Sequence, residues 1–227
     1  MERSGFLGVT QRGGPWRVGL NRERVLAAAI ELADRDGLDS LTMRRLGEEL
    51  RVEAMSIYTY VANKEDLLAG MVNAVFAEIE LPSHDGDWKS AIRKRSVSFR
   101  DALSSHPWVM SLRDLGTAPG LAKLRHLDSA LGSLRNGGLS LTLTAHAISA
   151  IDSYVYGFAM REGSLPFKTE QETAIMAQSM LDELPTAEYP YLAELTATHV
   201  LQPGYNYANE FEFGLDLLLD ALVRKRD

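Results

Sequence analysis

The sequence predicts an all-α protein, and three observations support this. Apolar residues recur at spacings of three and four along almost the whole chain, which is typical of amphipathic helices. Runs of alternating β-branched residues, which would indicate strands, are missing. Prolines and glycines stand between the periodic stretches, where they end helices. We therefore expect a small N-terminal helical domain followed by a larger helical body.

The N-terminal helices follow from their cap residues. Residues 1–20 have no apolar stretch of the kind found in secretion signals and predict a flexible arm. The first helix is expected over 22–36, with Gly37 as its stop. Thr42 is the predicted N-cap of a second helix over 43–50, and a very short third helix follows over 54–60. Asn63 is the predicted cap of a fourth helix that continues to residue 79.

Beyond residue 87 the predicted helices become longer. We expect them over 88–104, 108–115, 120–135, 141–162, 170–184, 189–200 and 206–226. Each break between them contains proline or glycine. Four prolines fall between 164 and 204, and the sequence leaves the conformation of that segment open.

Composition limits the class of protein. The chain of 227 residues contains no cysteine, which excludes disulfide frameworks and cysteine-ligated metals. No stretch is long and apolar enough for a membrane helix, so we expect no membrane partner and a cytoplasmic location. The net charge of −7 argues at first against nucleic acid. However, residues 1–63 contain nine basic and nine acidic residues, so the excess negative charge lies entirely in the body.

Three short helices with a tight turn between the second and third predict a helix-turn-helix, whose third helix enters the major groove. With Ile57 and Val61 turned inward, the third helix exposes Met55, Ser56, Thr59 and Tyr60, with Tyr58 on one flank. Their hydroxyl groups are suited to bases and phosphates, and Lys64 follows where the next helix begins. The alternative is that Tyr58 and Tyr60 pack against the first helix.

At these residues the chain resembles the DNA-binding domain of TetR-family transcriptional repressors. The resemblance covers residues 22–76 and rests on Leu-Thr-Met-Arg-Arg-Leu at 41–46 and Ser-Ile-Tyr-Thr-Tyr-Val-Ala-Asn-Lys-Glu-Asp-Leu-Leu at 56–68. It implies a DNA-binding domain over 21–67, a ligand-responsive body over 68–227, and a homodimer on a palindromic double-stranded operator. It also implies DNA contacts from Thr42, Arg44, Ala54, Met55, Ser56, Tyr58, Thr59, Tyr60 and Lys64. Ala54 and Met55 would read bases by apolar contact, for example with a thymine methyl group.

A dimer is also expected from the helix patterns. The predicted helix over 206–226 is apolar on two faces, and a helix of that kind must bury both. Phe211, Leu215, Leu218 and Leu222 would pack internally, while Leu217 and Ala221 would face a second subunit. The predicted helix over 141–162 carries small residues at intervals of four, which allow close helix approach. We therefore expect a homodimer through 141–162 and 206–226.

The body contains Trp88, a Ser-Phe-Arg-x-Ala-Leu run at 98–103, Ser105-His106, Gly116-Thr117, Ala150-Ile151 and Phe213-Gly214-Leu215. At these residues it resembles the C-terminal domain of tetracycline-responsive members of the same family. The family's metal-coordinating histidine is replaced here by Arg113 or Asp114, so tetracycline is not the expected ligand. The candidate lining for a small-molecule effector is Arg95, Phe99, Leu103, Trp108, Leu112, Arg113, Thr117, His146, Asp152 and Tyr156. Charged groups inside apolar helix faces need a partner or a ligand, although the aromatic residues alone would equally suit an ordinary core.

The predicted function is a dimeric repressor that a small molecule releases from its operator. A DNA-binding activator or architectural protein without a ligand is the alternative. An enzyme is disfavoured, because the five histidines are scattered and no nucleophile elbow or phosphate loop is present. His146 and Asp152 lie on different faces of their helix, so no metal or cofactor is expected. The operator, the effector and the regulated genes are not determined by the sequence.

Overall fold

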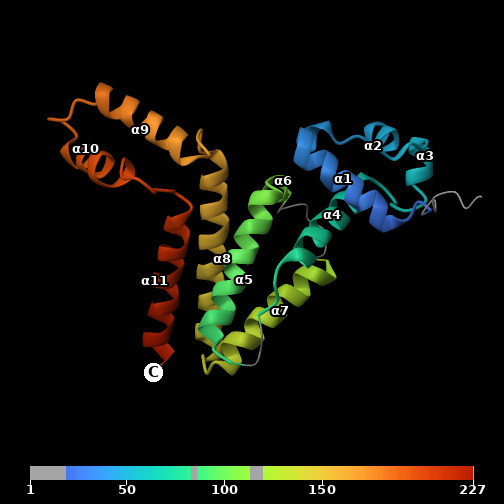
Figure 1. Cartoon of the computed structure of the whole chain (residues 1–227). Coiled ribbons are helices and arrows are strands. Elements are labelled where there is room, and N and C mark those ends of the chain that lie inside the picture. The colour runs from blue at the N-terminus through green and yellow to red at the C-terminus, as the bar shows by residue number, and fades with distance from the viewer. Residues whose placement is uncertain (1–18, 83–85, 113–119, 227) are drawn as a thin grey trace, which may run out of the picture.

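The computed structural model describes residues 19–82, 86–112 and 120–226, and these residues form helices and turns without strands. The all-α prediction is therefore confirmed. The helices, drawn in Figure 1, are α1 (Arg22–Asp36), α2 (Met43–Leu50), α3 (Ala54–Ile57), α4 (Lys64–Glu78), α5 (Trp88–Ser105), α6 (Trp108–Ser111), α7 (Leu121–Asn136), α8 (Leu141–Ser164), α9 (Glu170–Glu183), α10 (Pro190–Leu195) and α11 (Asn209–Arg226). A 3₁₀ turn, η1 (Leu38–Ser40), follows α1, and a π-helical turn, η2 (Thr196–Val200), follows α10.

The first three helices form a head at one end of the molecule, and α4 connects this head to the body (Figure 1). In the body, α5 packs against α8 and α11, while α7 packs against α4, α5 and α8. The α9–α10 hairpin projects from the end of α8, away from the head (Figure 1). Because α4 contacts both α1 and α7, it crosses the domain boundary that we place at residue 67.

The caps predicted at Thr42 and Asn63 are present, and Asn21, which was not predicted, caps α1 in the same way. Asn21, Thr42 and Asn63 each accept a hydrogen bond from a backbone N–H in the first turn of the helix that follows. Gly37 ends α1 with a φ of 80°, a conformation that side chains disfavour. The cap chemistry thus fixes where the head helices begin and end.

Four predicted boundaries were wrong. The helix predicted over 108–115 ends at Ser111, where the Leu112 N–H bonds back to the Val109 carbonyl. The third helix ends at Ile57 instead of residue 60, because Thr59 and Tyr60 close i+3 backbone bonds and the Tyr60 carbonyl accepts a hydrogen bond from Arg22. The predicted helix over 189–200 divides into α10 and η2. The last helix begins at Asn209, since the Asn206 side chain accepts from the Ala208 N–H and holds the preceding residues in a turn.

The last helix packs against α8 at close range. Gly214 lies beside Tyr154, and a β-carbon there would come within 2.2 Å of the phenolic oxygen. That hydroxyl donates to the Phe211 carbonyl at 3.0 Å. The buried side chains of α11 are Phe211, Leu215 and Leu219, so Leu219 takes the inner position that we expected for Leu218, which is only partly buried.

None of the described helices is long and apolar enough to cross a membrane. The segments 1–18, 83–85 and 113–119 lie outside the described residues, and with them most of the predicted N-terminal arm, Arg113 and Thr117.

Candidate nucleic-acid interface and effector site

The turn between α2 and α3 is closely packed. A β-carbon at Gly47 would lie 2.8 Å from the carbonyl oxygen of Val52, so a hydrogen atom is all that fits there. Arg51 ends α2 in the left-handed conformation, with φ 56° and ψ 44°. These two backbone features set the direction in which α3 leaves α2.

The third helix and the turn after it expose the side chains predicted to read DNA. Ile57 and Val61 are buried, whereas Met55 is 74% exposed and Tyr58 is 43% exposed. Ser56 and Thr59 are also exposed. Tyr60 is half-buried and packs against the core, so the alternative of packing applies in part to this tyrosine.

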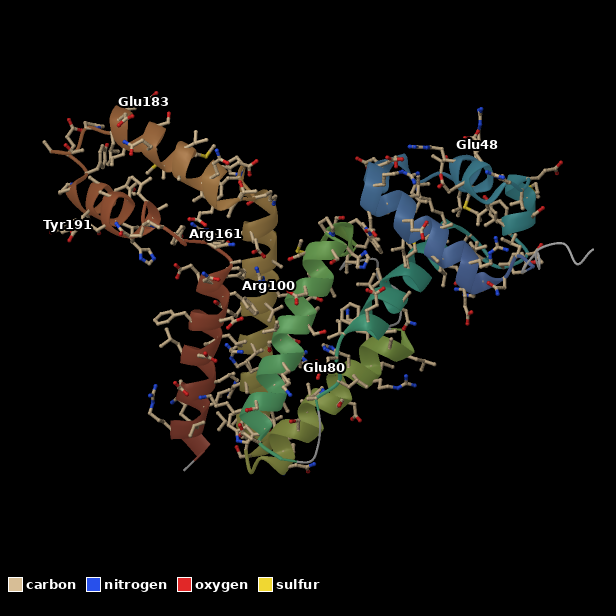
Figure 2. All side chains as sticks on the ribbon, in the orientation of Figure 1. Glu48, Glu80, Arg100, Arg161, Glu183 and Tyr191 are labelled. Atoms are coloured by element: carbon tan, nitrogen blue, oxygen red, sulfur yellow. The ribbon has the colours of Figure 1, made fainter. Side chains whose placement is uncertain are left out.

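The remaining predicted DNA contacts surround α3. Arg44 is exposed on α2 and forms an ion pair with Glu48, which lies at the outer edge of the head in Figure 2. Lys64 is exposed at the first position of α4. Thr42 is exposed at the cap of α2 and Ala54 is half-buried. All nine residues therefore lie on α2 and its cap, on α3 and the turn after it, and at the start of α4, and their DNA contacts remain predictions.

A clamp between α1 and α4 holds the turn that follows α3. Both guanidinium nitrogens of Arg22 donate to the Asp66 carboxylate, at 2.7 and 3.0 Å, and Nη1 also donates to the Tyr60 carbonyl. The Ala62 N–H donates to the same carboxylate. The bonds from Arg22 and then from Ala62 lower the pKa of Asp66 from 3.8 to about 2. The second half of the turn at 58–62 is thus bonded to both α1 and α4.

Inside the body, a fully buried arginine joins three helices. Arg95 of α5 donates from Nε to Nε2 of His126 on α7 at 3.1 Å, and from Nη1 to Asp152 of α8 at 2.8 Å. Burial, reinforced by the charge of Arg95, lowers the pKa of His126 to about 3. His126 is therefore neutral near pH 7 and accepts from Arg95.

Aromatic rings surround this group. Phe99 packs edge-on against Tyr156 and His126, with ring centroids 5.0 and 5.3 Å apart, and the Arg95 guanidinium lies over the Phe99 ring. Phe76 from α4 contacts both Phe99 and His126. The interior therefore combines apolar ring surface with a few convergent polar groups, as small-molecule sites do.

The structure brings some of the predicted effector residues together and separates others. Arg95, Phe99, Asp152 and Tyr156 form one group, and Leu103 continues the same buried side of α5. Trp108 and Leu112 are buried, although Trp108 turns toward the head. His146 is exposed on α8 and lies apart from this group, so its role in the effector site remains a prediction.

Two residues of this interior were not predicted as effector residues, namely His126 and Phe76. His126 lies four residues before the buried Ala130 and eight before the buried Leu134, so its spacing places it on the inner face of α7. That signal was available in the sequence. Among the described residues, no group of three or more histidine, aspartate and glutamate side chains is placed to hold a metal ion.

A separate cavity of about 520 Å³ lies where α5, the end of α8 and the start of α11 meet. Arg100 (Figure 2) and Glu162 form an ion pair in its wall, with Nε and Oε2 3.0 Å apart. Lys168 donates to the last carbonyls of α8. The cavity is also lined by Leu103, Pro107, Met110, Phe167 and Tyr207. The cations of this wall are thus already paired within the protein.

The head and the body meet at a polar contact. Asp34 of α1 accepts from the Trp108 indole at 2.6 Å and lies 2.9 Å from Nδ1 of His106. Nε2 of His106 lies 3.2 Å from Glu78 of α4. The turn between α5 and α6 therefore touches both helices that carry the head.

Comparison with known proteins agrees with this arrangement. The family model for bacterial regulatory proteins of the tetR family matches residues 25–71. The family model for the tetracyclin repressor-like C-terminal domain matches residues 81–225. The second match alone covers more than half of the chain. The chain belongs to the TetR family of transcriptional regulators.

Individual relatives lead to the same family. The HTH-type transcriptional repressor DrrR1 of Streptomyces coeruleorubidus is 30% identical over 213 residues, which cover 89% of this chain and 77% of that protein. The class C tetracycline repressor of Escherichia coli is 28% identical over 211 residues, covering 91% and 92%. The resemblance seen in the sequence is thus confirmed across the head and the body of this TetR-family chain.

Two solved TetR-family structures have a similar fold. ActR of Streptomyces coelicolor, in complex with actinorhodin, has a TM-score of 0.73 and 26% identity, and the match covers 92% of this chain and 99% of that chain. The regulator SCO7222 of the same species has a TM-score of 0.76 and 25% identity, covering 92% and 100%. As a TetR-family member, this chain is a transcriptional regulator with a helix-turn-helix head.

Proposed function

We propose that the protein is a homodimeric repressor that leaves its operator when a small molecule binds the body. Residues 21–67 would read DNA, and residues 68–227 would bind the effector and the second subunit. The observation that carries the proposal is the polar contact of Asp34 with His106 and Trp108. This contact joins α1 of the head to the turn between α5 and α6. Arg95 lies on α5, N-terminal to that turn. A change at that site therefore has a short path to the head.

The relatives support both halves of this proposal. DrrR1 and the tetracycline repressor are named as repressors. ActR was solved in complex with the small molecule actinorhodin. A repressor that binds operator DNA would act in the cytoplasm, and our proposal includes no enzymatic activity.

The surface of the body supports a dimer through α8 and α11. On α11, Phe213 is 66% exposed and Leu217 is 56% exposed. On α8, the small residues Ser149, Ser153 and Gly157 are exposed, and nothing lies within 4 Å of a β-carbon placed on Gly157. Large apolar side chains beside an open strip of small residues fit a helix from a second copy.

The charge distribution makes a dimer necessary for function. The head is neutral overall and the body is acidic, so affinity for DNA must come from oriented contacts in two half-sites rather than from bulk charge. We therefore expect binding that is specific, depends on the dimer and is weak on random DNA.

The test is a gel-shift titration of the full chain on the DNA that flanks its own gene, at two salt concentrations, with and without a compound library. We expect a shift that at least one compound reverses. A shift that no compound reverses favours the ligand-free activator or architectural protein. Absence of any shift contradicts both readings. Sedimentation at micromolar concentration checks the dimer, and a monomer there contradicts it.

A further inference from the structure

The buried arginine at the centre of the body has an unused donor. Arg95 is 0% exposed, and its Nε and Nη1 are bonded to His126 and Asp152. Its Nη2 is buried and has no acceptor among the residues that the structure describes. A guanidinium carries five N–H donors and accepts nothing, and buried donors in proteins are nearly always paired. Among the described residues, neither N–H group of Nη2 therefore has a hydrogen-bond acceptor.

The charges at this site are already balanced. The positive charge of Arg95 faces the negative charge of Asp152 at 2.8 Å. His126 is neutral, because its pKa is about 3, and its Nε2 lone pair is taken by Arg95. An additional anion or cation would add an uncompensated charge to a buried site, which is unfavourable. The missing acceptor should therefore be a neutral atom.

The walls favour a flat ring. The ring of Phe99 contacts the rings of His126 and Tyr156 edge to face. Asp152 and Tyr156 also line a groove of about 450 Å³ on the outer side of α8, together with Ser153. Asp152 and Tyr156 are thus shared between the buried Arg95 group and this surface groove. In the proposed dimer, the second subunit covers this groove.

We propose that the effector is a neutral molecule with a flat aromatic ring system and a carbonyl-type oxygen that accepts a hydrogen bond from Nη2 of Arg95. This inference rests on the proposed function and specifies the class of effector. Asp152 and His126 are positioning residues, which hold the guanidinium so that its remaining donor serves the ligand.

The experiment compares matched probes on the full-length protein. Each of two ring systems is tested in three forms, namely the ketone, the parent compound without the ketone oxygen, and the 9-carboxylate. The first series is fluorenone, fluorene and fluorene-9-carboxylate. The second is xanthone, xanthene and xanthene-9-carboxylate. Direct binding is measured by calorimetry. In at least one ring system, we expect the ketone to bind about tenfold more tightly than both analogues, since it alone supplies a neutral carbonyl oxygen at that position.

Three variants test the assignment of Arg95. Arg95→Met removes the donor, so the advantage of the ketone should fall to about twofold or less. Asp152→Asn leaves the arginine charge uncompensated, so the carboxylate should gain about tenfold in affinity while the ketone changes less. Arg125→Met makes the same chemical change on the exposed face of α7 and should leave the wild-type order intact.

Several outcomes overturn the inference. The inference is rejected if the carboxylate binds the wild type most tightly, or if Arg95→Met still prefers the ketone. It is also rejected if no probe binds to protein that still binds its operator. If Arg95→Met does not fold, an unchanged probe order in Asp152→Asn is sufficient to reject the inference. Failure of the proposed function would look different, because the wild type would then not shift operator DNA at all.

Discussion

The indole N–H of Trp108 donates to Oδ1 of Asp34 across 2.6 Å and thereby ties α6 of the body to α1 of the head. Asp34 is also in contact with His106, whose other ring nitrogen faces Glu78 of α4. The segment from His106 to Trp108 thus contacts both α1 of the head and the connecting helix α4. In a ligand-responsive regulator, a contact of this kind can transmit a change in the body to the DNA-reading helices.

We predict that Trp108→Phe weakens this transmission. Phenylalanine retains the ring but loses the hydrogen bond to a carboxylate, which is worth about 1.5–3 kcal/mol. The factor by which saturating effector lowers operator affinity should therefore fall by about tenfold. Gel-shift titration with and without effector measures it. Trp88→Phe is the matched control, because Trp88 is buried at the far end of α5, and equal losses in both variants would contradict the prediction.

Substitutions in the head should separate base reading from phosphate binding. Tyr58→Phe and Lys64→Ala should weaken binding to all DNA sequences about equally. Ser56→Ala and Thr59→Ala should instead relax the preference for the operator, because these exposed side chains are placed to meet base edges. Competition between operator and random DNA is the measurement. Equal loss on both DNAs in all four variants would remove the base-reading role of α3 and its turn.

Arg51→Gly should stabilise the head. Arg51 ends α2 at φ 56°, a region that costs residues with a β-carbon about 1–2 kcal/mol and glycine nothing. After allowance for the larger entropy of glycine in the unfolded chain, a gain of about 0.5–1 kcal/mol remains. Urea denaturation measures it, and a lower unfolding midpoint would show that the arginine makes a compensating contact.

The clamp between Arg22 and Asp66 should make the head sensitive to acid. The pKa of Asp66 falls from 3.8 to about 2 on folding, so the ionised form is favoured in the folded state. Its contribution is complete above about pH 4 and is lost as the pH falls through about 2. The difference in urea midpoint between wild type and Asp66→Asn should therefore be constant near neutral pH and shrink below pH 4. Asp39→Asn, an exposed change in η1, should show no such difference, and a gap that widens with acid would contradict the assignment.

The sequence predicted the head in detail because its determinants are local. Thr42 and Asn63 cap helices that begin one residue later, and Ile57 and Val61 face inward as their spacing requires. The end of α3 was not predictable in this way. The turn at Tyr60 depends on a hydrogen bond from Arg22, 38 residues away in the chain.

The effector site shows the same division between local and long-range information. Arg95 and Phe99 were both predicted to line the effector site; they lie four residues apart on α5, and both are buried. Their partners, His126 and Asp152, come from α7 and α8, and nothing in the periodicity of α5 states which helix lies opposite. His146 was assigned to the same interior because it lies on α8, but its position turns it to solvent.

By itself, the sequence determined the helical class, the caps, the DNA-reading motif and the family, because these depend on residues close together in the chain. Tertiary structure alone decided which polar groups meet: Asp34 with Trp108, Arg22 with Asp66, and Arg95 with His126 and Asp152. Such pairs depend on how helices cross, and side-chain packing between distant segments, not local periodicity, sets that geometry. The unused donor of Arg95, on which the proposed class of effector rests, is visible only after those partners have been counted.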